Sequence, residues 1–398
     1  MRSYPIRSLL AVALAFGLTL AGGASTLDAQ GKGTIKIATQ SPLSGGQAAL
    51  GEGIKLGAQL GVEKFKGALE KQGFKVELVP FDDQAKPDVG VANARNIIAD
   101  KDIMVVIGHL NSGVAIPSSE VYKEASLAMI SPANTNEKIT DRGYPNVNRV
   151  CGRDDVQGPV GAEFAATTLK VKSVYIVHDK TTYGQGVAEA FKRDIEKKGV
   201  KIVGFDGTEE KSNFDPIVTP IKAKNPDLIY FGGIYDQGAP FFKQAREKGV
   251  KSKFLGPDGL DSSDLVKIAG KAVVGMYYTT AAAPASSPQA KQFAEEFKKK
   301  FGKNPEPYAA ESYVATAIAV KALESVVAGG KAPSREGVAA AIRKVKYAGM
   351  TGTIEFDDKG DPKKASYYVL QVSSDNPEKW TENKEAKRLA IAAPSAKK

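Results

Sequence analysis

The sequence has very few of the side chains that bind metals or form disulfides. Its 398 residues include one cysteine, Cys151, and two histidines, His109 and His178. A single cysteine cannot form an internal disulfide, and so few thiol and imidazole groups do not favour a zinc or copper site. We expect no bound metal, and we expect Cys151 to be a small buried residue.

The sequence also lacks the motifs of common enzymes. An aspartate follows His178, but no nucleophile motif of the Gly-x-Ser-x-Gly kind occurs anywhere in the chain. The pair Gly184 and Gly186 lacks the third glycine of a dinucleotide-binding fingerprint. The sequence therefore predicts a protein that is not an enzyme and has no cofactor. An exported α/β hydrolase is an alternative, but it would need a nucleophile with a nearby base.

No long apolar run follows residue 30. The first 30 residues differ, because two arginines precede an apolar run at 9–23 that ends in small residues. This pattern predicts a secretory signal peptide over residues 1–30, cleaved after Ala24 or after Ala29. An uncleaved anchor is the alternative. The expected location of the mature protein is periplasmic, or more generally extracytoplasmic.

Basic residues exceed acidic ones, 55 to 45, for a net charge of +10. An excess of this sign can indicate nucleic-acid binding. The lysines are, however, spread over many amphipathic segments, such as residues 191–199 and 293–303. We therefore expect a solvated surface and no nucleic-acid partner.

From Gly33 onward, apolar strands alternate with helices over short connections. Strands that read as continuous apolar runs, each followed by a helix, are typical of a parallel sheet covered on both faces. The pattern occurs twice, which predicts an α/β protein with two doubly wound, Rossmann-like lobes. The expected strands are 34–40, 74–83, 103–110, 127–132, 173–179, 202–207, 227–233, 253–256 and 274–280.

The rest of the chain does not repeat this pattern. Three helices with no strand between them are expected at 288–302, 308–330 and 335–345, packed back onto the first sheet. Residues 352–361 and 366–372 are expected to form a terminal strand pair, and the tail 381–398 to be frayed and flexible.

The chain is therefore expected to cross between the lobes about three times. The crossings are predicted near residues 148–155, 281–284 and 353–360. The predicted N-terminal lobe comprises 31–152 plus 283–354, and the predicted C-terminal lobe comprises 153–282 plus 355–380.

Open α/β sheets bind ligands outside the carboxyl ends of their strands. Hydroxyls, aromatic rings and acids follow the expected strands of both lobes, and two facing lobes would gather them into one cleft. These strand-end stretches are residues 111–113, 131–136, 181–184, 234–236 and 257–259.

Several of these stretches occur in an order and at a spacing that resemble a known family. The fragments are "VVIGHLNSG", "MISPANT", "NRVCGRDDVQGP", "IVHDKTTYGQG" and "FLGPDG". They resemble the periplasmic branched-chain amino acid-binding proteins of ABC transporters, over roughly residues 33–372. The resemblance implies a type I periplasmic binding fold, in which two lobes close by a hinge on a free amino acid. It also implies delivery of that amino acid to membrane permease subunits.

The resemblance assigns roles to five residues. It implies that Ser112 and Thr135 bind the ligand carboxylate through their hydroxyls, and that the Ala133 carbonyl accepts from the ammonium. Asp258, one methylene shorter than the glutamate of close relatives, would pair with the ammonium from the other lobe, and Tyr183 would lie at the cleft edge. Considered alone, Ser112 is also typical of a helix N-cap, and Thr135 and Asp258 are also typical of turns. Asn134 and Asn136 are expected to be turn residues.

The chain departs from the family at the side-chain pocket. Leu50 stands where an aromatic residue is frequent, and Ile234 stands where a tyrosine is expected, with Tyr235 one position later. Ala85 and Asn111 replace the cysteines that form a disulfide in some relatives. We therefore expect an aliphatic pocket that includes Leu50, Ile234 and Tyr235, and a monomer that binds an aliphatic amino acid.

Two alternatives keep the fold and change the role. The site could take an amide, urea or aromatic acid in place of an amino acid. A ligand-sensing receptor domain shares the fold, but it would need a tethered signalling module that this sequence lacks.

Overall fold

The computed structural model describes residues 31–282, 288–350 and 352–392. The predicted signal peptide, residues 1–30, lies outside the described residues. So do residues 283–284 of the second predicted crossing and residues 393–398 of the tail.

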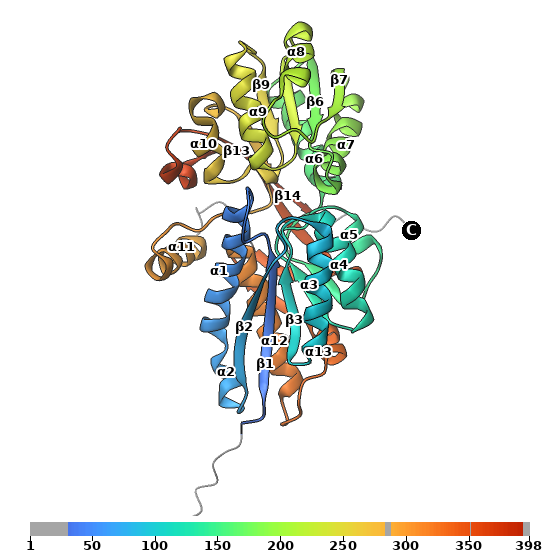
Figure 1. The fold of residues 1–398 in the computed structure, drawn as a ribbon, viewed down its shortest axis with the longest axis vertical. Helices are drawn as coiled ribbons and strands as arrows, with labels where there is room; N and C mark the ends of the chain where they lie inside the picture. The colour runs from blue at the N-terminus through green and yellow to red at the C-terminus, as the bar shows by residue number, and fades with distance from the viewer. Residues whose placement is uncertain (1–30, 283–287, 351, 393–398) are drawn as a thin grey trace, which may run out of the picture.

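The chain forms two lobes that are stacked along the long axis of the molecule (Figure 1). The first lobe contains a five-stranded parallel sheet with strand order β2-β1-β3-β4-β5. Its strands are β1 (Thr34–Ser41), β2 (Lys75–Asp82), β3 (Ile103–Gly108), β4 (Ala128–Ser131) and β5 (Val147–Arg149).

Helices cover both faces of this sheet, as the continuous apolar strands predict. Alternate strand residues pack against α1, α12 and α13 on one face and against α3, α4 and α5 on the other. The helices are α1 (Ala48–Phe65), α2 (Gly67–Lys71), α3 (Pro87–Ala99), α4 (Ser112–Glu124), α5 (Lys138–Asp141), α11 (Pro288–Phe301), α12 (Ala309–Val327) and α13 (Arg335–Ile342).

The second lobe contains a seven-stranded sheet with strand order β14-β13-β10-β9-β8-β6-β7. Strands β6 to β10 are parallel, while β13 and β14 are antiparallel to their neighbours. The strands are β6 (Ser173–His178), β7 (Lys201–Gly207), β8 (Leu228–Gly232), β9 (Lys253–Gly256), β10 (Tyr277–Thr280), β13 (Lys364–Gln371) and β14 (Lys384–Ala392). In both lobes the second strand along the chain lies outside the first, which creates a topological switch point beside β1 and beside β6.

Helices also cover the parallel part of the second sheet on both faces. An aromatic core that includes Phe231, Phe241 and Phe242 lies under α8, α9 and α10, and α6 and α7 pack on the opposite face. The helical segments are α6 (Asp154–Glu163), η1 (Phe164–Thr168), α7 (Thr182–Lys197), α8 (Asp215–Lys224), α9 (Tyr235–Glu247), η2 (Asp258–Leu260), α10 (Ser263–Ala269), η3 (Gly270–Val273) and η4 (Pro377–Glu382).

The expectation of a frayed tail is wrong for residues 384–392. These residues form β14, which pairs with β13 along the full length of that strand. Without β14, β13 would be the exposed edge of the sheet. The many charged residues of β14 interrupt the apolar pattern by which a strand is recognised in the sequence. Charge is nevertheless common on edge strands, because it discourages pairing with other chains.

The predicted terminal strand pair is also wrong. Residues 352–355 form β12 (Gly352–Glu355), which pairs with β11 (Lys346–Gly349) in a small sheet of its own, while β13 joins the second lobe. The two predicted partners cannot pair along their length because the chain crosses between the lobes after β12. One isolated bridge, between Phe356 and Pro362, remains in that crossing.

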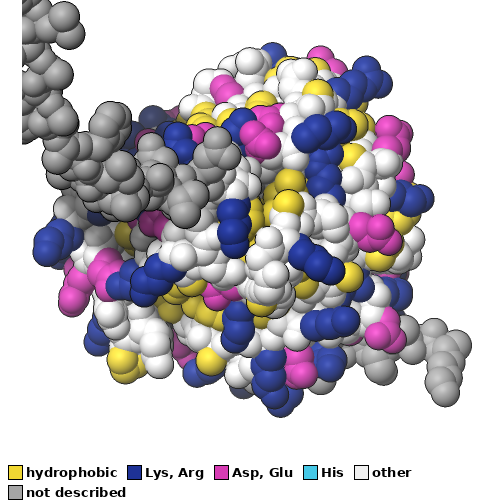
Figure 2. Space-filling view, turned by 90° about the horizontal axis from the view of Figure 1, so that it is seen from below, with side chains coloured by type: hydrophobic (Ala, Val, Ile, Leu, Met, Phe, Trp, Pro, Cys, Tyr) yellow, Lys and Arg dark blue, Asp and Glu magenta, His cyan; other side chains and the backbone are white. Residues whose placement is uncertain are grey.

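The surface carries scattered charge. On the face that Figure 2 shows, basic and acidic side chains lie among one another, with small apolar groups between them. None of the helices that the structure describes is long and apolar enough to cross a membrane.

A buried ionic cluster joins the first and third crossings. Arg149, at the end of β5, is fully buried and donates to Asp361 in the third crossing at 2.5 Å. Arg153 donates to the other Asp361 oxygen at 2.8 Å. Burial alone would raise the pKa of Asp361, but the two guanidinium groups outweigh it and lower that pKa. The cluster joins two of the segments that run between the lobes. It therefore fixes the side of the molecule where the chain crosses, which is its hinge side.

Replacement of Arg149 by methionine tests this cluster. Arg149→Met leaves a buried carboxylate with one of its two guanidinium partners, so we expect the free energy of unfolding to fall by about 3–5 kcal/mol. Urea denaturation at neutral pH measures the change. As a control, Lys66→Met breaks an exposed ion pair with Glu70, and no measurable loss is expected there. A loss below about 1 kcal/mol for Arg149→Met would show that the cluster is not a main stabilising feature.

Candidate functional site

The strand-end loops of the two lobes meet around one small cavity. The loops after β3 and β4 come from the first lobe, and those after β6, β8 and β9 come from the second. The cavity has a volume of about 20 Å³. Its lining residues are Leu50, Leu110, Asn111, Ala133, Tyr183, Ile234, Asp258, Gly259 and Tyr308.

The structure brings most of the predicted site residues together. Five of the eight line the cavity: Leu50, Ala133, Tyr183, Ile234 and Asp258. Ser112 and Thr135 are buried in the same first-lobe loops without lining the cavity. Tyr235 is buried at the start of α9, and its pKa is raised mainly by burial, next by Asp264 and Asp236. It lies outside the lining, so its predicted ligand contact gains no support from this geometry.

The lobes are closed on each other. A cavity of this volume holds about one water molecule, so a ligand as large as an amino acid enters only when the lobes separate. Hydrogen bonds hold the lobes together across the junction. Asn136 donates to the Thr182 carbonyl at 3.1 Å, and the Ser263 hydroxyl donates to Glu306 at 2.5 Å.

The first-lobe side of the site carries a hydroxyl without a well-formed hydrogen bond. The Thr135 Oγ1 atom is buried and has no hydrogen-bond partner of normal geometry among the described residues, although it lies close enough to the Asp154 carboxyl to oppose the rise in that group's pKa. The Ser112 Oγ atom accepts a long, 3.4 Å bond from the Asn136 amide. Buried hydroxyls are nearly always paired, so these groups fit a site for an external acceptor such as a carboxylate.

Asn134 joins the two first-lobe loops. Its Oδ1 atom accepts from the His109 amide at 2.9 Å and from the Ser131 hydroxyl at 2.7 Å, and its Nδ2 atom donates to the Leu110 carbonyl at 2.8 Å. The expectation that Asn134 is only a turn residue is therefore wrong, since its side chain is fully buried. It fixes the loop that holds Ser112 relative to the loop that holds Thr135.

The second-lobe side of the site is a buried carboxylate. Asp258 is 2% exposed and accepts hydrogen bonds from the Tyr183 hydroxyl, at 2.5 Å, and from the Tyr308 hydroxyl. Burial raises the pKa of Asp258, and the two phenols partly offset that rise. The Tyr183 oxygen in turn accepts from the Gly259 amide at 2.8 Å.

Tyr308 was not found from the sequence. It precedes α12 in the left-handed conformation, with φ of 69°, and it reaches Asp258 from the first lobe. Gly57 of α1 allows this placement, because a Cβ atom there would collide with the Ala309 carbonyl at the start of α12. No local motif marks this tyrosine. It lies more than 100 residues away along the chain from the other first-lobe loops of the site.

A second buried acid, Asp154, lies near this carboxylate. It begins α6 and is fully buried. Burial raises the pKa of Asp154 well above its usual range, the charge of Asp258 adds to the rise, and the Thr135 hydroxyl opposes it. The region around Asp154 and Asp258 thus favours a positive charge, because a cation would stabilise the ionised form of both carboxyl groups.

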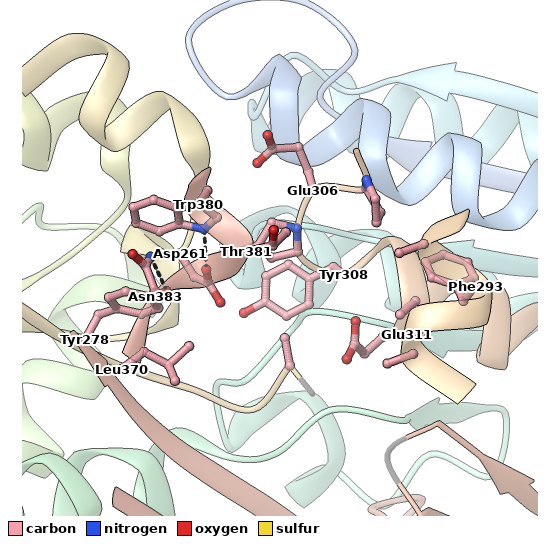
Figure 3. Close-up of a pocket in the computed structure, with 16 residues that line it drawn as sticks. Asp261, Tyr278, Phe293, Glu306, Tyr308, Glu311, Leu370, Trp380, Thr381 and Asn383 are labelled. Carbon is pink, nitrogen blue, oxygen red and sulfur yellow. Dashed lines mark hydrogen bonds between the residues drawn. The ribbon is translucent and has the colours of Figure 1, made fainter. Parts of the chain in front are cut away.

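A larger cavity of about 110 Å³ lies on the other side of Tyr308, again between the lobes (Figure 3). Figure 3 shows Asp261 bonded to the Trp380 indole N–H, at 2.9 Å, and Glu306 near Tyr308. Burial raises the pKa of Asp261 to about 7, and the bond from Trp380 partly offsets this rise. Tyr308 lines both cavities and separates them.

The donors around the site do not suggest a metal centre. Within the ranges that the structure describes, no group of three or more His, Cys, Asp or Glu side chains is arranged to hold a metal ion.

Two doubly wound lobes that close on a buried cavity at their strand ends define a class of protein, the bilobal solute-binding proteins. Comparison with known proteins identifies the family within this class. A family model described as periplasmic binding protein matches residues 34–377. The chain belongs to this family, which confirms the resemblance seen in the sequence.

Similar proteins of known sequence and structure agree. An amino acid binding protein of Pseudomonas aeruginosa is 34% identical over 85% of this chain and 90% of that protein. The leucine-, isoleucine-, valine-, threonine-, and alanine-binding protein of the same organism is 32% identical over 86% of this chain and 91% of that protein. A crystal structure of a leucine-binding protein from Thermotoga maritima has a TM-score of 0.79 and 30% identity, and the match covers 90% of this chain and 99% of that one. These relatives are binding proteins, and the family name implies an extracytoplasmic location.

Replacement of Asn134 by alanine tests its role in joining the loops. Asn134→Ala removes three buried hydrogen bonds, so we expect a loss of about 1.5–4.5 kcal/mol of stability. We also expect faster amide exchange in residues 109–113 and 131–136. Asn146→Ala is the control, because Asn146 makes a single buried bond to Leu127 and should leave exchange in both loops unchanged. Equal exchange in the two variants would contradict the role assigned to Asn134.

Proposed function

We propose that this chain is the extracytoplasmic solute-binding component of an ABC transporter. It captures a free aliphatic amino acid between its lobes and delivers it to permease subunits in the membrane. The observation that carries the proposal is a buried second-lobe carboxylate that lines the interlobe cavity, together with buried first-lobe hydroxyls in the loops beside that cavity.

The two sides of the site are complementary to the two charges of an amino acid. A zwitterion that leaves water needs a partner for each charge, or desolvation defeats binding. Thr135 and Ser112 offer hydroxyls to the carboxylate, while the Ala133 carbonyl and Asp258 accept from the ammonium. Each charge-assisted hydrogen bond contributes about 1.5–3 kcal/mol. The neighbouring Asp154 strengthens the preference of this region for a cation.

The rest of the lining supports an aliphatic side chain. Leu50, Leu110 and Ile234 are each less than 10% exposed and carry no polar side-chain atoms. Burial of an aliphatic side chain against them contributes about 1.5–3 kcal/mol. The relative named for leucine, isoleucine, valine, threonine and alanine supports this assignment, since four of these five side chains are aliphatic.

Binding and closure are coupled, because Asp258, the charged partner of the ammonium, stands on the lobe opposite the partners of the carboxylate. Only the closed form pairs the ammonium with a carboxylate, so the ligand shifts the population toward closure. A permease can then distinguish loaded protein from empty protein by the relation of its lobes.

A second candidate is an acid without an amino group, such as an aromatic carboxylate. The observation that favours it is that the Asp258 carboxylate already accepts hydrogen bonds from Tyr183 and Tyr308. A ligand without a cation would therefore leave no buried charge unpaired on that side.

A panel of free L-amino acids, amides and aromatic acids separates the two candidates. In a thermal-shift assay on protein freed of ligand, an aliphatic amino acid at 100 times its Kd should add about 2.7 kcal/mol of stability. Asp258→Asn should weaken its binding about 10- to 150-fold but hardly affect a ligand without a cation. Asp261→Asn, in the second cavity, is the matched control and should leave the affinity unchanged. If no amino acid stabilises the folded, ligand-free protein, this ligand class is wrong.

The pH dependence of binding tests the role of Asp258. Its pKa is raised in the free protein, and a bound ammonium would lower it because the pair favours the ionised acid. Binding should therefore release protons, and affinity should fall as the pH drops below the raised pKa. Titration calorimetry in buffers of different ionisation enthalpy measures the release. Asp258→Asn should abolish it and Asp154→Asn should preserve it, and the reverse result would make Asp154 the ammonium partner.

A further inference from the structure

One loop of the first lobe contacts the second lobe at two points. The loop joins α11 to α12 and includes Glu306, whose carboxylate accepts from the Ser262 hydroxyl at 3.1 Å, the Ser263 amide at 3.3 Å and the Ser263 hydroxyl at 2.5 Å. Both serines stand at the start of α10 in the second lobe. Tyr308, two residues further on (Figure 3), donates to Asp258, which precedes the serines. The loop therefore holds a single stretch of the second lobe through two side chains.

The sequence makes this loop stiff. Glu306 stands between two prolines, Pro305 and Pro307. Each proline has a fixed φ angle, and each also restricts the backbone of the residue before it. Few backbone conformations are therefore open to Glu306, and little entropy is lost when its side chain bonds to the second lobe.

Helix α1 supports the loop from within the first lobe. A Cβ atom at Gly53 of α1 would lie 3.2 Å from the Glu306 Cβ atom and 3.5 Å from the Pro307 carbonyl oxygen. These short distances show that the loop packs directly on the helix. Glu306 therefore projects from a fixed base in the first lobe. Its bonds to the serines form only when the lobes are closed, because the serines move with the second lobe.

These bonds lie apart from the cavity where the ligand is proposed to bind. Glu306, Ser262 and Ser263 are not among the residues that line that cavity. Glu306 and Ser263 line a separate groove at the junction of the lobes. The bonds therefore contribute to closure whether or not the cavity is filled.

We infer that the loop of residues 304–308 is a clasp, in which Glu306 stabilises the closed form independently of any ligand. Glu306 acts as a positioning residue, because it holds the second-lobe stretch that carries Asp258 against the first lobe. This inference goes beyond the proposed function, since it concerns closure itself. The clasp sets the balance of open and closed protein on which a ligand then acts.

The distance between two spin labels, one on each lobe, measures this balance in the mature chain freed of ligand. Lys243 of α9 and Lys299 of α11 are exposed and can be replaced by cysteine for labelling, while the native Cys151 is buried. We expect a short-distance population that corresponds to closed lobes. Glu306→Ala should lower the ratio of closed to open protein about tenfold or more, as the loss of hydrogen bonds to a charged group would.

Three further variants identify the contact that is responsible. Glu306→Gln keeps an acceptor oxygen without the charge, so it should lower the ratio by a smaller factor than Glu306→Ala. Ser263→Ala removes the hydroxyl that shares a bond with Glu306, so the double variant should lose little more than Glu306→Ala alone. Glu296→Ala is the matched control, because Glu296 of α11 pairs with Lys64 of the same lobe, and its ratio should equal that of the unchanged protein.

Three results would overturn the proposal. The first is a ligand-free protein without any closed population, and the second is an unchanged ratio in Glu306→Ala. The third is additive losses in the double variant, because Glu306 would then act through a contact other than Ser263. None of these measurements needs a ligand. Failure of the unchanged protein to bind any amino acid would contradict the proposed function alone, so the two failures are distinct.

Discussion

A buried guanidinium, that of Arg149, is the constraint on which the geometry of the site depends. It makes four hydrogen bonds, which reach Asp361 in the third crossing, the Asn134 and Asn136 carbonyls, and the Thr140 hydroxyl. A charge in this position is tolerated because four of its five N–H donors find acceptors, one of which is a carboxylate. The same group therefore ties the hinge side of the molecule to the loop that carries Thr135.

The two lobes contribute different chemical groups to the site. The first lobe presents hydroxyls, a carbonyl and the tyrosine of α12, and the second presents a carboxylate held by Tyr183. Under the proposed function, the first lobe offers the ammonium only a carbonyl, and closure adds the carboxylate of the second lobe. The bonds between the lobes, such as Asn136 to Thr182, add to that closure without contacting the cavity.

Much of the fold and half of the site follow from reasoning on the sequence. The strands are recognisable because they are continuous apolar runs, and the rule that ligands bind at strand carboxyl ends leads to the stretches that contain Ala133, Tyr183 and Asp258. The family resemblance then singles out these residues within the stretches. The same reasoning misjudged β14, where charges mask an edge strand, and the pairing of β12, where the chain changes lobe. It placed both Ile234 and Tyr235 in the pocket; Ile234 lines the cavity, and the ligand contact of Tyr235 stays a prediction.

Local sequence determined the alternation of helix and strand, the two-lobe plan and the kinds of residue at the strand ends, because these depend on periodicity and on neighbours along the chain. The tertiary structure alone decided which distant side chains share a site. Tyr308 reaches Asp258 because α12 packs closely on Gly57 of α1, and the Asn136 amide of the first lobe donates to the Thr182 carbonyl of the second. Such contacts depend on the packing of segments far apart in the sequence, which leaves no periodic signal within any one of them.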